Sequence, residues 1–315
     1  MAPKVKTFFR NFLLLLHEAG NDFLDDHGTK FSASLAYYTI LSIGPILLVI
    51  ITLMGFFYKK AYATSQVFDQ IGQFLGATES AQLKGMLDNI SKQNIGTLFG
   101  VIGILILLFS STSIFTEIQS SINYIWSIKA RPKRSWVKYI TDRLLSFLLI
   151  IGMGLLMLVT LFINLVIDLL SGRFRRFLGD ADIILLKGSN IALLFIVATL
   201  LFAIIYKVLP DAKIHWKDAL IGASFTAILF QIGKFLISYY LGSSKIINAY
   251  GAAASIILLL SWIYYSSIIL YFGAEFTKVY AMKWGKGITV NDSAVYIIKR
   301  EAKELPALKH PVPEN

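Results

Sequence analysis

The sequence LPDAKIHWKDALIGASFTAILFQIGKFLISYYLGSSKIINAYGAAASIILLLSWIYYSSIILYFGAEFTKVY, residues 209–280, decides the fold class. It contains two apolar runs, residues 216–240 and 251–280, and each is long enough to cross a hydrocarbon layer about 30 Å thick. Only residues 241–250 join the two runs. Because exposed backbone groups find no hydrogen-bond partners in lipid, so short a connection forces an antiparallel helical hairpin. We therefore predict a pair of membrane-spanning helices here.

The composition of the whole chain is that of a protein that crosses the membrane several times. Of its 315 residues, 56% are hydrophobic and 16% are charged, which is too apolar for an ordinary soluble domain. The apolar residues form long blocks and do not alternate with polar ones, so the excess is membrane-spanning. The net charge of +11 is explained by Lys and Arg in loops that face an anionic lipid surface, and we predict no nucleic-acid partner.

These blocks predict an all-α bundle of six transmembrane helices within a domain of residues 31–280. The long loop 59–94 carries two short amphipathic segments and is expected to cap the outer mouth of the bundle. Most of the Lys and Arg residues fall on the side that holds both termini, which places the N- and C-termini in the cytoplasm. The predicted spans are residues 31–58, 95–116, 143–170, 189–209, 216–240 and 251–280.

Two shorter regions flank this domain. Residues 1–30 contain an amphipathic helix that fits the membrane surface, where its cations would meet the anionic lipids of the cytoplasmic leaflet, although it could equally dock on the bundle. Residues 281–315 form a charged cytoplasmic tail, for which we predict one short helix near residues 292–303.

A specific order of motifs runs through the predicted bundle. AYYTILSIGPILL lies at residues 36–48, INYIW at 122–126, LPDAKIHWKDALIGASFTA at 209–227 and YGAAASIILLLSWIYYSSIILYFGAEF at 250–276. In this order, over residues 31–280, the chain resembles the BrkB/YihY family of bacterial inner-membrane proteins. The resemblance implies a six-helix bundle in the cytoplasmic membrane with a role in the cell envelope and a suspected role in transport. It implies no agreed substrate, although members long carried the label ribonuclease BN.

The sequence offers little to support a nuclease or any other enzyme. The four histidines are scattered without metal-ligand spacing, and the chain has no cysteine. Adjacent Asp25 and Asp26 lie beside the first span in no metal-binding pattern, and no glycine-rich phosphate loop occurs. We predict no catalytic residues, no cofactor and no metal.

Polar residues on one face of the fifth predicted span are the leading candidates for a binding site. Lys234 lies deepest, and Gln231 and Ser238 share its face with the small residues Ala223 and Ala227. The lysine could line a polar cavity and meet an anionic head group, or its stem could carry the ammonium to the membrane interface. The stripe could also be a surface for close helix packing. Tyr239, Tyr250 and Asn123 complete the predicted substrate-binding set.

Two acidic residues and one Gly-Pro pair are candidates for moving parts. Glu117 and Glu275 lie near the cytoplasmic ends of their helices and could couple or gate transport, although Glu275 could instead form an interfacial ion pair with Lys278 one turn away. Gly44 and Pro45 lie in the middle of the first span, where proline should kink the helix. That kink is either a hinge or an ordinary feature of a spanning helix.

We therefore predict a non-enzymatic transporter, or a lipid- or amphiphile-handling protein, of the bacterial cytoplasmic membrane. The alternative is a membrane scaffold that anchors envelope protein partners and moves nothing. A ribonuclease is the least favoured hypothesis.

Overall fold

The computed structural model describes residues 2–55, 59–75, 77–91, 113–131, 135–178, 181–243 and 254–299. Most of these residues are helical, and residues 113–125 belong to a further helix without a label. The labelled helices are α1 (Ala2–Asp25), α2 (Gly28–Gly55), α3 (Lys60–Leu75), α4 (Ala77–Ser91), α6 (Ser135–Leu178), α7 (Ala181–Val208), α8 (Trp216–Ser243) and α10 (Ala254–Lys283). The strands are β1 (Ile128–Ala130), β2 (Ala212–Ile214), β3 (Ile288–Val290) and β4 (Ala294–Tyr296).

Three of these helices are long and apolar enough to cross a membrane. The stretches that qualify are Tyr139–Thr160 in α6, Ile191–Val208 in α7 and Trp216–Ile237 in α8. The chain is therefore a helical membrane protein, as the apolar blocks predicted. Helices α2 and α10 cover most of the predicted spans 31–58 and 251–280. Most of the predicted span 95–116 lies outside the described residues, so the count of six and the orientation of the termini stay predictions.

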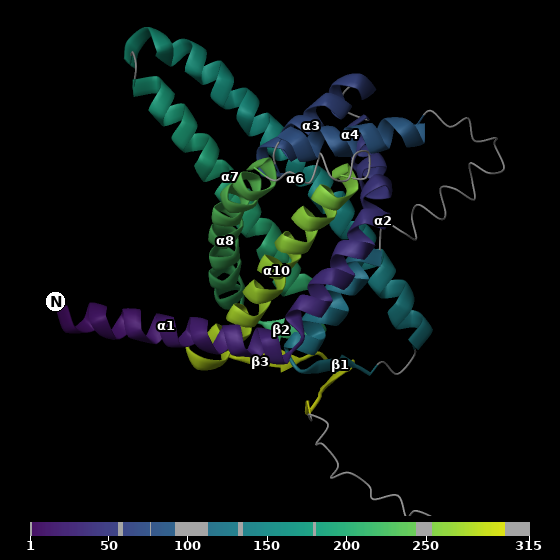
Figure 1. Cartoon of the computed structure of the whole chain (residues 1–315), viewed down its shortest axis with the longest axis vertical. Helices are drawn as coiled ribbons and strands as arrows, with labels where there is room; N and C mark the ends of the chain where they lie inside the picture. Colours follow the sequence, from purple (N-terminus) through teal and green to yellow (C-terminus); the bar gives the residue numbers. More distant parts are fainter. Residues whose placement is uncertain are drawn as a thin grey trace, which may run out of the picture.

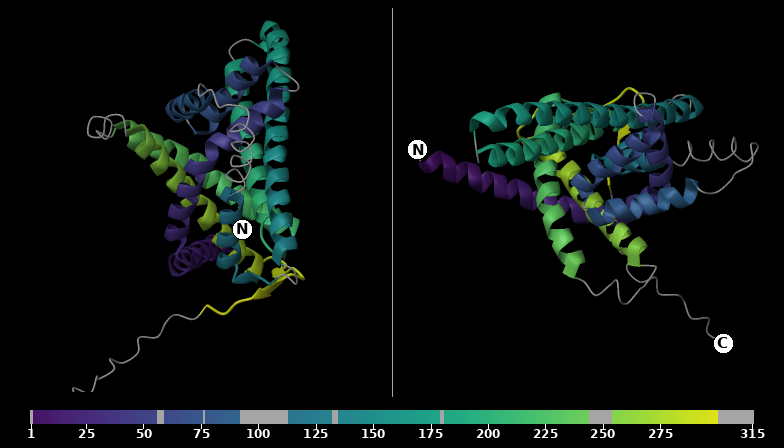
Figure 2. Two further views of the ribbon diagram at one scale, coloured as in Figure 1. Left: turned by 90° about the vertical axis from the view of Figure 1, so that its right-hand side faces the viewer. Right: turned by 90° about the horizontal axis from the view of Figure 1, so that it is seen from above.

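The helices form a bundle with two different ends (Figure 1). At one end, called here the strand end, α1 lies across the bundle beside the four strands. Helices α3 and α4 pack on each other and lie toward the opposite end, and the perpendicular view agrees (Figure 2). If the termini are cytoplasmic, the strand end faces the cytoplasm and the α3–α4 end faces outward.

Helix α1 docks on the bundle through its C-terminal half. Leu15 and Ala19 are buried and pack against Phe276 and Val279 of α10. Leu13 and Leu14 are exposed on the other side of the helix. Docking was one of the two alternatives for this segment; contact of its exposed face with lipid remains a prediction.

The C-terminal region differs from the prediction. Residues 292–299 contain strand β4 and no helix, so the short helix expected at 292–303 is wrong for this part of the tail. Strand β4 pairs antiparallel with β1, and β3 pairs antiparallel with β2. These two small sheets tie the tail to segments far back in the chain, and such distant partners override local helix propensity. The bundle is therefore not purely α-helical.

Helices α8 and α10 approach each other closely because small residues face each other at their contact. A Cβ at Gly222 would overlap Thr277, and a Cβ at Gly273 would overlap Thr226. Ala223 and Ala227 are fully buried, in agreement with the packing alternative for this face.

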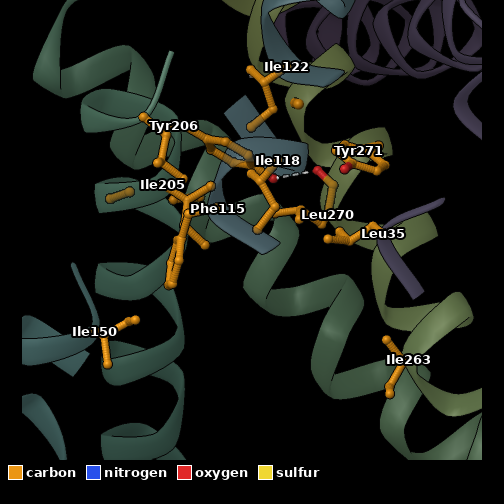
Figure 3. Packing of buried hydrophobic residues seen from close by; sticks show 14 of the residues in the cluster. Leu35, Phe115, Ile118, Ile122, Ile150, Ile205, Tyr206, Ile263, Leu270 and Tyr271 are labelled. Atoms are coloured by element: carbon orange, nitrogen blue, oxygen red, sulfur yellow. Dashed lines mark hydrogen bonds between the residues drawn. The ribbon is translucent and has the colours of Figure 1, made fainter. Parts of the chain in front are cut away.

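A buried tyrosine ties this contact to α7. The Tyr206 hydroxyl donates to the Leu270 carbonyl at 2.8 Å and shares a hydrogen bond of 3.0 Å with the Thr226 hydroxyl. Figure 3 shows Tyr206 and Leu270 among the apolar side chains of the core, close to Ile118 and Phe115. The close contact of α8 with α10 therefore lies where buried hydroxyl groups also find hydrogen-bond partners.

The substitution Gly273→Ala tests the close approach of α8 and α10. The added methyl group overlaps Thr226 and the Tyr206 hydroxyl, so we expect a loss of about 1–3 kcal/mol in stability, as is usual for overpacking. Gly85→Ala in α4 is the matched control, because a Cβ there meets no heavy atom within 4 Å. Thermal unfolding in detergent measures both variants, and equal stability of the two would contradict the packing account.

Candidate functional site

An apolar cavity of about 350 Å³ lies inside the bundle. Helices α2, α6, α7 and α8 form its walls, and α3 and α4 contribute residues toward their end of the bundle. Gln70 and Thr160 are the polar side chains among the described lining residues, and the Thr160 hydroxyl donates to the Leu156 carbonyl within its own helix. The lining residues are Ile43, Ile46, Leu47, Ile50, Gln70, Ile71, Leu83, Met153, Leu156, Thr160, Val197, Ala198, Leu201, Phe202, Ile205 and Phe230.

A second, polar cleft of about 830 Å³ opens at the strand end. It lies between the first turns of α6, the end of α7, strand β2 and the turn at 291–293. Among the described residues, its charged lining residues are Asp142, Asp211, Lys213 and Asp292. Lys213 and Asp292 form an ion pair of 3.5 Å at the exposed rim, where such a pair holds its partners weakly.

Asp211 is fixed in this cleft by two amide side chains from residues 113–125. Its carboxylate oxygen Oδ2 accepts hydrogen bonds from Asn123 Nδ2 at 2.9 Å and Gln119 Nε2 at 3.4 Å. Its backbone N–H donates to Asn123 Oδ1 at 2.8 Å. All three residues are buried. Asn123, a predicted substrate-binding residue, therefore holds Asp211 in position in the cleft wall.

A cluster of charges joins α1, α10 and the tail. Glu275 accepts from Lys278 Nζ at 2.8 Å, so the ion pair that was one alternative for this residue is present, but its carboxylate is fully buried and not interfacial. Lys278 also lies 3.0 Å from Asp22 Oδ2 and 3.5 Å from Asp26 Oδ2, and Lys299 pairs with Asp26. Both lysines donate to the carbonyl of residue 125 at 3.2 Å. The cluster therefore locks four segments together at the strand end.

Burial also changes the protonation equilibrium of one lysine in the charge cluster. Burial lowers the pKa of the Lys299 amine, although the hydrogen bond to Asp26 opposes that effect. The carboxylate thus only partly compensates the ammonium for the water it has lost.

The predicted site residues fall at two different ends of the bundle. Lys234 is half-buried and lies 18 positions beyond Trp216, the first residue of α8, so it stands roughly 27 Å along the helix from the strand end. Glu275 lies eight positions before the end of α10, roughly 12 Å from that same end. The two charged groups therefore do not share one site.

The structure places some of the other predicted site residues, and others lie outside the part of the chain that it describes. Gln231 is half-buried, and neither it nor Lys234 is among the described residues that line the two cavities. Glu117 is half-buried in the helical segment 113–125. Tyr250 lies outside the described residues, as do the side chains of Ser238, Tyr239 and Pro45. Helix α2 continues through Gly44 and Pro45, and a hinge there stays a prediction.

Neither the apolar cavity nor the polar cleft with Asp211 was predicted from the sequence. The apolar cavity lies between six helices, and no local sequence pattern distinguishes the residues that line it from other apolar residues. Within the described parts of the chain, no group of three His, Asp or Glu side chains is placed to hold a metal ion.

Comparisons with known proteins agree with a membrane protein. A family model described as "Virulence factor BrkB" matches residues 19–294. A "UPF0761 membrane protein" from Psychromonas ingrahamii is 31% identical over 250 residues, covering 77% of this chain and 79% of its own. Proteins of the same name from Tolumonas auensis and Pseudoalteromonas atlantica are both 29% identical, over 77% and 88% of this chain and 77% and 87% of their own. No solved structure matches.

The charge cluster predicts an unequal cost for two lysines of α10. Lys278→Met leaves the fully buried Glu275 without its cation, and we expect about 3–5 kcal/mol of destabilisation. Lys283→Met is the control, because the Lys283–Glu18 pair also joins α10 to α1 but is about half exposed, and its loss should cost at most about 1 kcal/mol. The double variant Glu275→Gln/Lys278→Met should recover most of the loss. Equal unfolding temperatures for the two single variants would refute this account.

Proposed function

This chain belongs to the BrkB family, and from that premise we propose that it binds an amphiphile by its hydrocarbon chain and moves it within or across the bacterial cytoplasmic membrane. The names of its relatives say that they are membrane proteins and assign them no reaction. Their names therefore fit a function in binding or transport as well as one in anchoring.

The observation that carries this proposal is the apolar cavity between α2, α6, α7 and α8. Its volume of about 350 Å³ lies within the range of small-molecule sites. Its lining offers water almost no hydrogen-bond partner, and such apolar cavities stay dry and take up apolar guests. The guest that surrounds a membrane-spanning bundle at the highest concentration is the lipid hydrocarbon chain.

The driving force for such binding differs from that in water. A lipid chain that leaves the bilayer for the cavity exchanges one apolar environment for another, so the hydrophobic effect contributes little. Dispersion contacts with the wall must supply the affinity, and they require a wall that matches the chain in shape. Residues that fill the cavity should therefore compete directly with the ligand.

The polar residues of α8 have a supporting part in this proposal. Phe230, which lines the cavity, lies one turn before Lys234 on α8. Lys234, with Gln231 and the predicted partners Ser238, Tyr239 and Tyr250, would meet a negatively charged group of the amphiphile as it reaches the α3–α4 end. If Lys234 instead only extends its ammonium to the interface, its replacement will leave transport unchanged.

At the strand end, Glu275 and Glu117 would couple movement of the helices to changes in the ion pairs there. Any shift of α10 against α1 must break the contacts of Lys278 with Asp22 and Asp26. Glu275 would control that step through its own bond to Lys278. Glu117 lies in the neighbouring segment 113–125, and Gly44 with Pro45 would let α2 bend during the same movement.

The charge cluster also supports the second candidate, a scaffold that transports nothing. It fixes α1 and the tail rigidly to the bundle and so presents a constant surface to envelope partners. A scaffold has no need of a chain-binding cavity, so lipid binding and translocation separate the two functions.

Filling the cavity tests chain binding. Ala198→Phe adds a ring to a buried lining position, and we expect it to reduce lipid translocation by the purified protein in vesicles roughly tenfold, because the ring occupies the space of the chain. The matched control is Leu200→Phe, two positions along α7 on the exposed side. Tail-labelled fluorescent phospholipid with a membrane-impermeant quencher gives the readout. Equal rates for wild type and Ala198→Phe would remove the cavity from the function.

Replacing the charge on α8 tests the polar residues. Lys234→Met keeps the length of the side chain and removes its ammonium, and we expect translocation to fall to the level of empty vesicles while the unfolding temperature stays within a few degrees. Lys217→Met, at the exposed start of the same helix, is the control. Unchanged transport by Lys234→Met would exclude that lysine from the substrate path.

A further inference from the structure

A third, small cavity of about 40 Å³ adjoins the apolar cavity on the side of the polar cleft. It shares four lining residues with the apolar cavity: Met153, Leu156, Leu201 and Ile205. Its other lining residues are Phe115, Leu149, Gly152 and Ile204. Figure 3 shows Phe115 and Ile205 close together in the core. The small cavity is therefore an extension of the large one toward the strand end.

The same helix faces continue from the small cavity into the polar cleft. On α6, Leu149 of the small cavity follows Leu145 of the cleft by one helical turn. On α7, Ile204 precedes Val208 by one turn. In the segment 113–125, Phe115 precedes Gln119 by one turn. Residues one turn apart lie above one another on a helix, so all three walls run on from one space to the next.

The length of the apolar part matches one layer of lipid chains. From Leu149 to Thr160 helix α6 rises roughly 17 Å. One leaflet fills half of a hydrocarbon core about 30 Å thick. An extended lipid chain that begins at the cleft would therefore reach the apolar cavity.

The charges of the cleft indicate the head group. Among the described residues, three carboxylates, Asp142, Asp211 and Asp292, and one ammonium, Lys213, line the cleft, although the chain as a whole carries a net charge of +11. Asn123 and Gln119 hold the Asp211 carboxylate in a fixed position. Lys213 forms an exposed ion pair with Asp292, and an ammonium held so weakly can exchange its partner for an anion of the ligand. The arrangement favours a head group with an ammonium and a phosphate.

We infer that the cleft and the two cavities form one binding path for a zwitterionic, amine-bearing membrane lipid. The ammonium of the head group binds at Asp142 and Asp211, its phosphate binds Lys213, and one hydrocarbon chain passes Phe115 and Met153 into the apolar cavity. A second chain stays in the bilayer. This inference rests on the proposed function and adds the class of substrate and its orientation.

The test is native mass spectrometry of the full chain in detergent with equimolar phosphatidylethanolamine and phosphatidylglycerol of identical chains. The first carries the amine and the second lacks it, so we expect the protein to retain the first roughly tenfold better, the factor of one charge-assisted hydrogen bond. Asp142→Asn should abolish this preference. Asp292→Asn, at a fully exposed side chain, should weaken it, and Asp88→Asn on α4 should leave it unchanged.

A separate variant tests whether the lipid chain passes through the small cavity. Gly152 lines the small cavity, and a Cβ there meets no heavy atom within 4 Å, so we expect Gly152→Phe to extend its ring into that cavity. We expect it to reduce retention of both lipids equally, by roughly tenfold. Gly85→Phe is the matched control, at a helical glycine with the same free space. Retention by Gly152→Phe at the level of wild type would overturn the path.

The remaining outcomes separate the inference from the proposed function. If wild type retains both lipids equally, the head-group assignment is wrong and chain binding stands. If it retains neither lipid and translocates none in vesicles, the proposed function fails, and the inference fails with it.

Discussion

Each backbone polar group that enters a bilayer must find its hydrogen-bond partner inside the protein, and the rest of this structure depends on that constraint. It makes the spanning segments helical, and it leaves side-chain packing to hold the helices together, because lipid supplies no hydrophobic force between them. The contact of α8 with α10 meets this demand with Gly222 and Gly273, beside which the buried hydroxyls of Tyr206 and Thr226 donate to the carbonyls of Leu270 and Gly222. The space between α2, α6, α7 and α8 is less tightly packed, and there the apolar cavity lies.

The helices were predictable from the sequence, since an apolar block of span length has one stable form in lipid. The predicted spans 143–170, 189–209 and 216–240 fall almost wholly within α6, α7 and α8. The tail was not predictable in the same way. Strand β4 has its partner β1 more than 160 residues earlier, and no local pattern in residues 292–299 announces that pairing. The fixed position of Asp211 likewise depends on Asn123, 88 residues away.

The candidate site was only partly predictable for the same reason. The Glu275–Lys278 pair follows from a spacing of three within one helix, and the structure contains it. Asp22 of α1, Asp26 of the turn after it and Lys299 of the tail join that pair, and only the fold brings them near. The polar stripe of α8 pointed to Lys234, whereas the spaces suited to a lipid lie along α6 and α7. Helical periodicity predicts which face of a helix is polar or apolar. It does not predict where the side chains of two packed helices leave a cavity between them.

The most direct measurement of the central claim is an electron cryo-microscopy map of the full chain in a nanodisc of native lipids. The account predicts elongated density for a hydrocarbon chain between α6 and α7, in contact with Met153, Ala198 and Leu201. A map in which these side chains close the space, with no density between them, would contradict it.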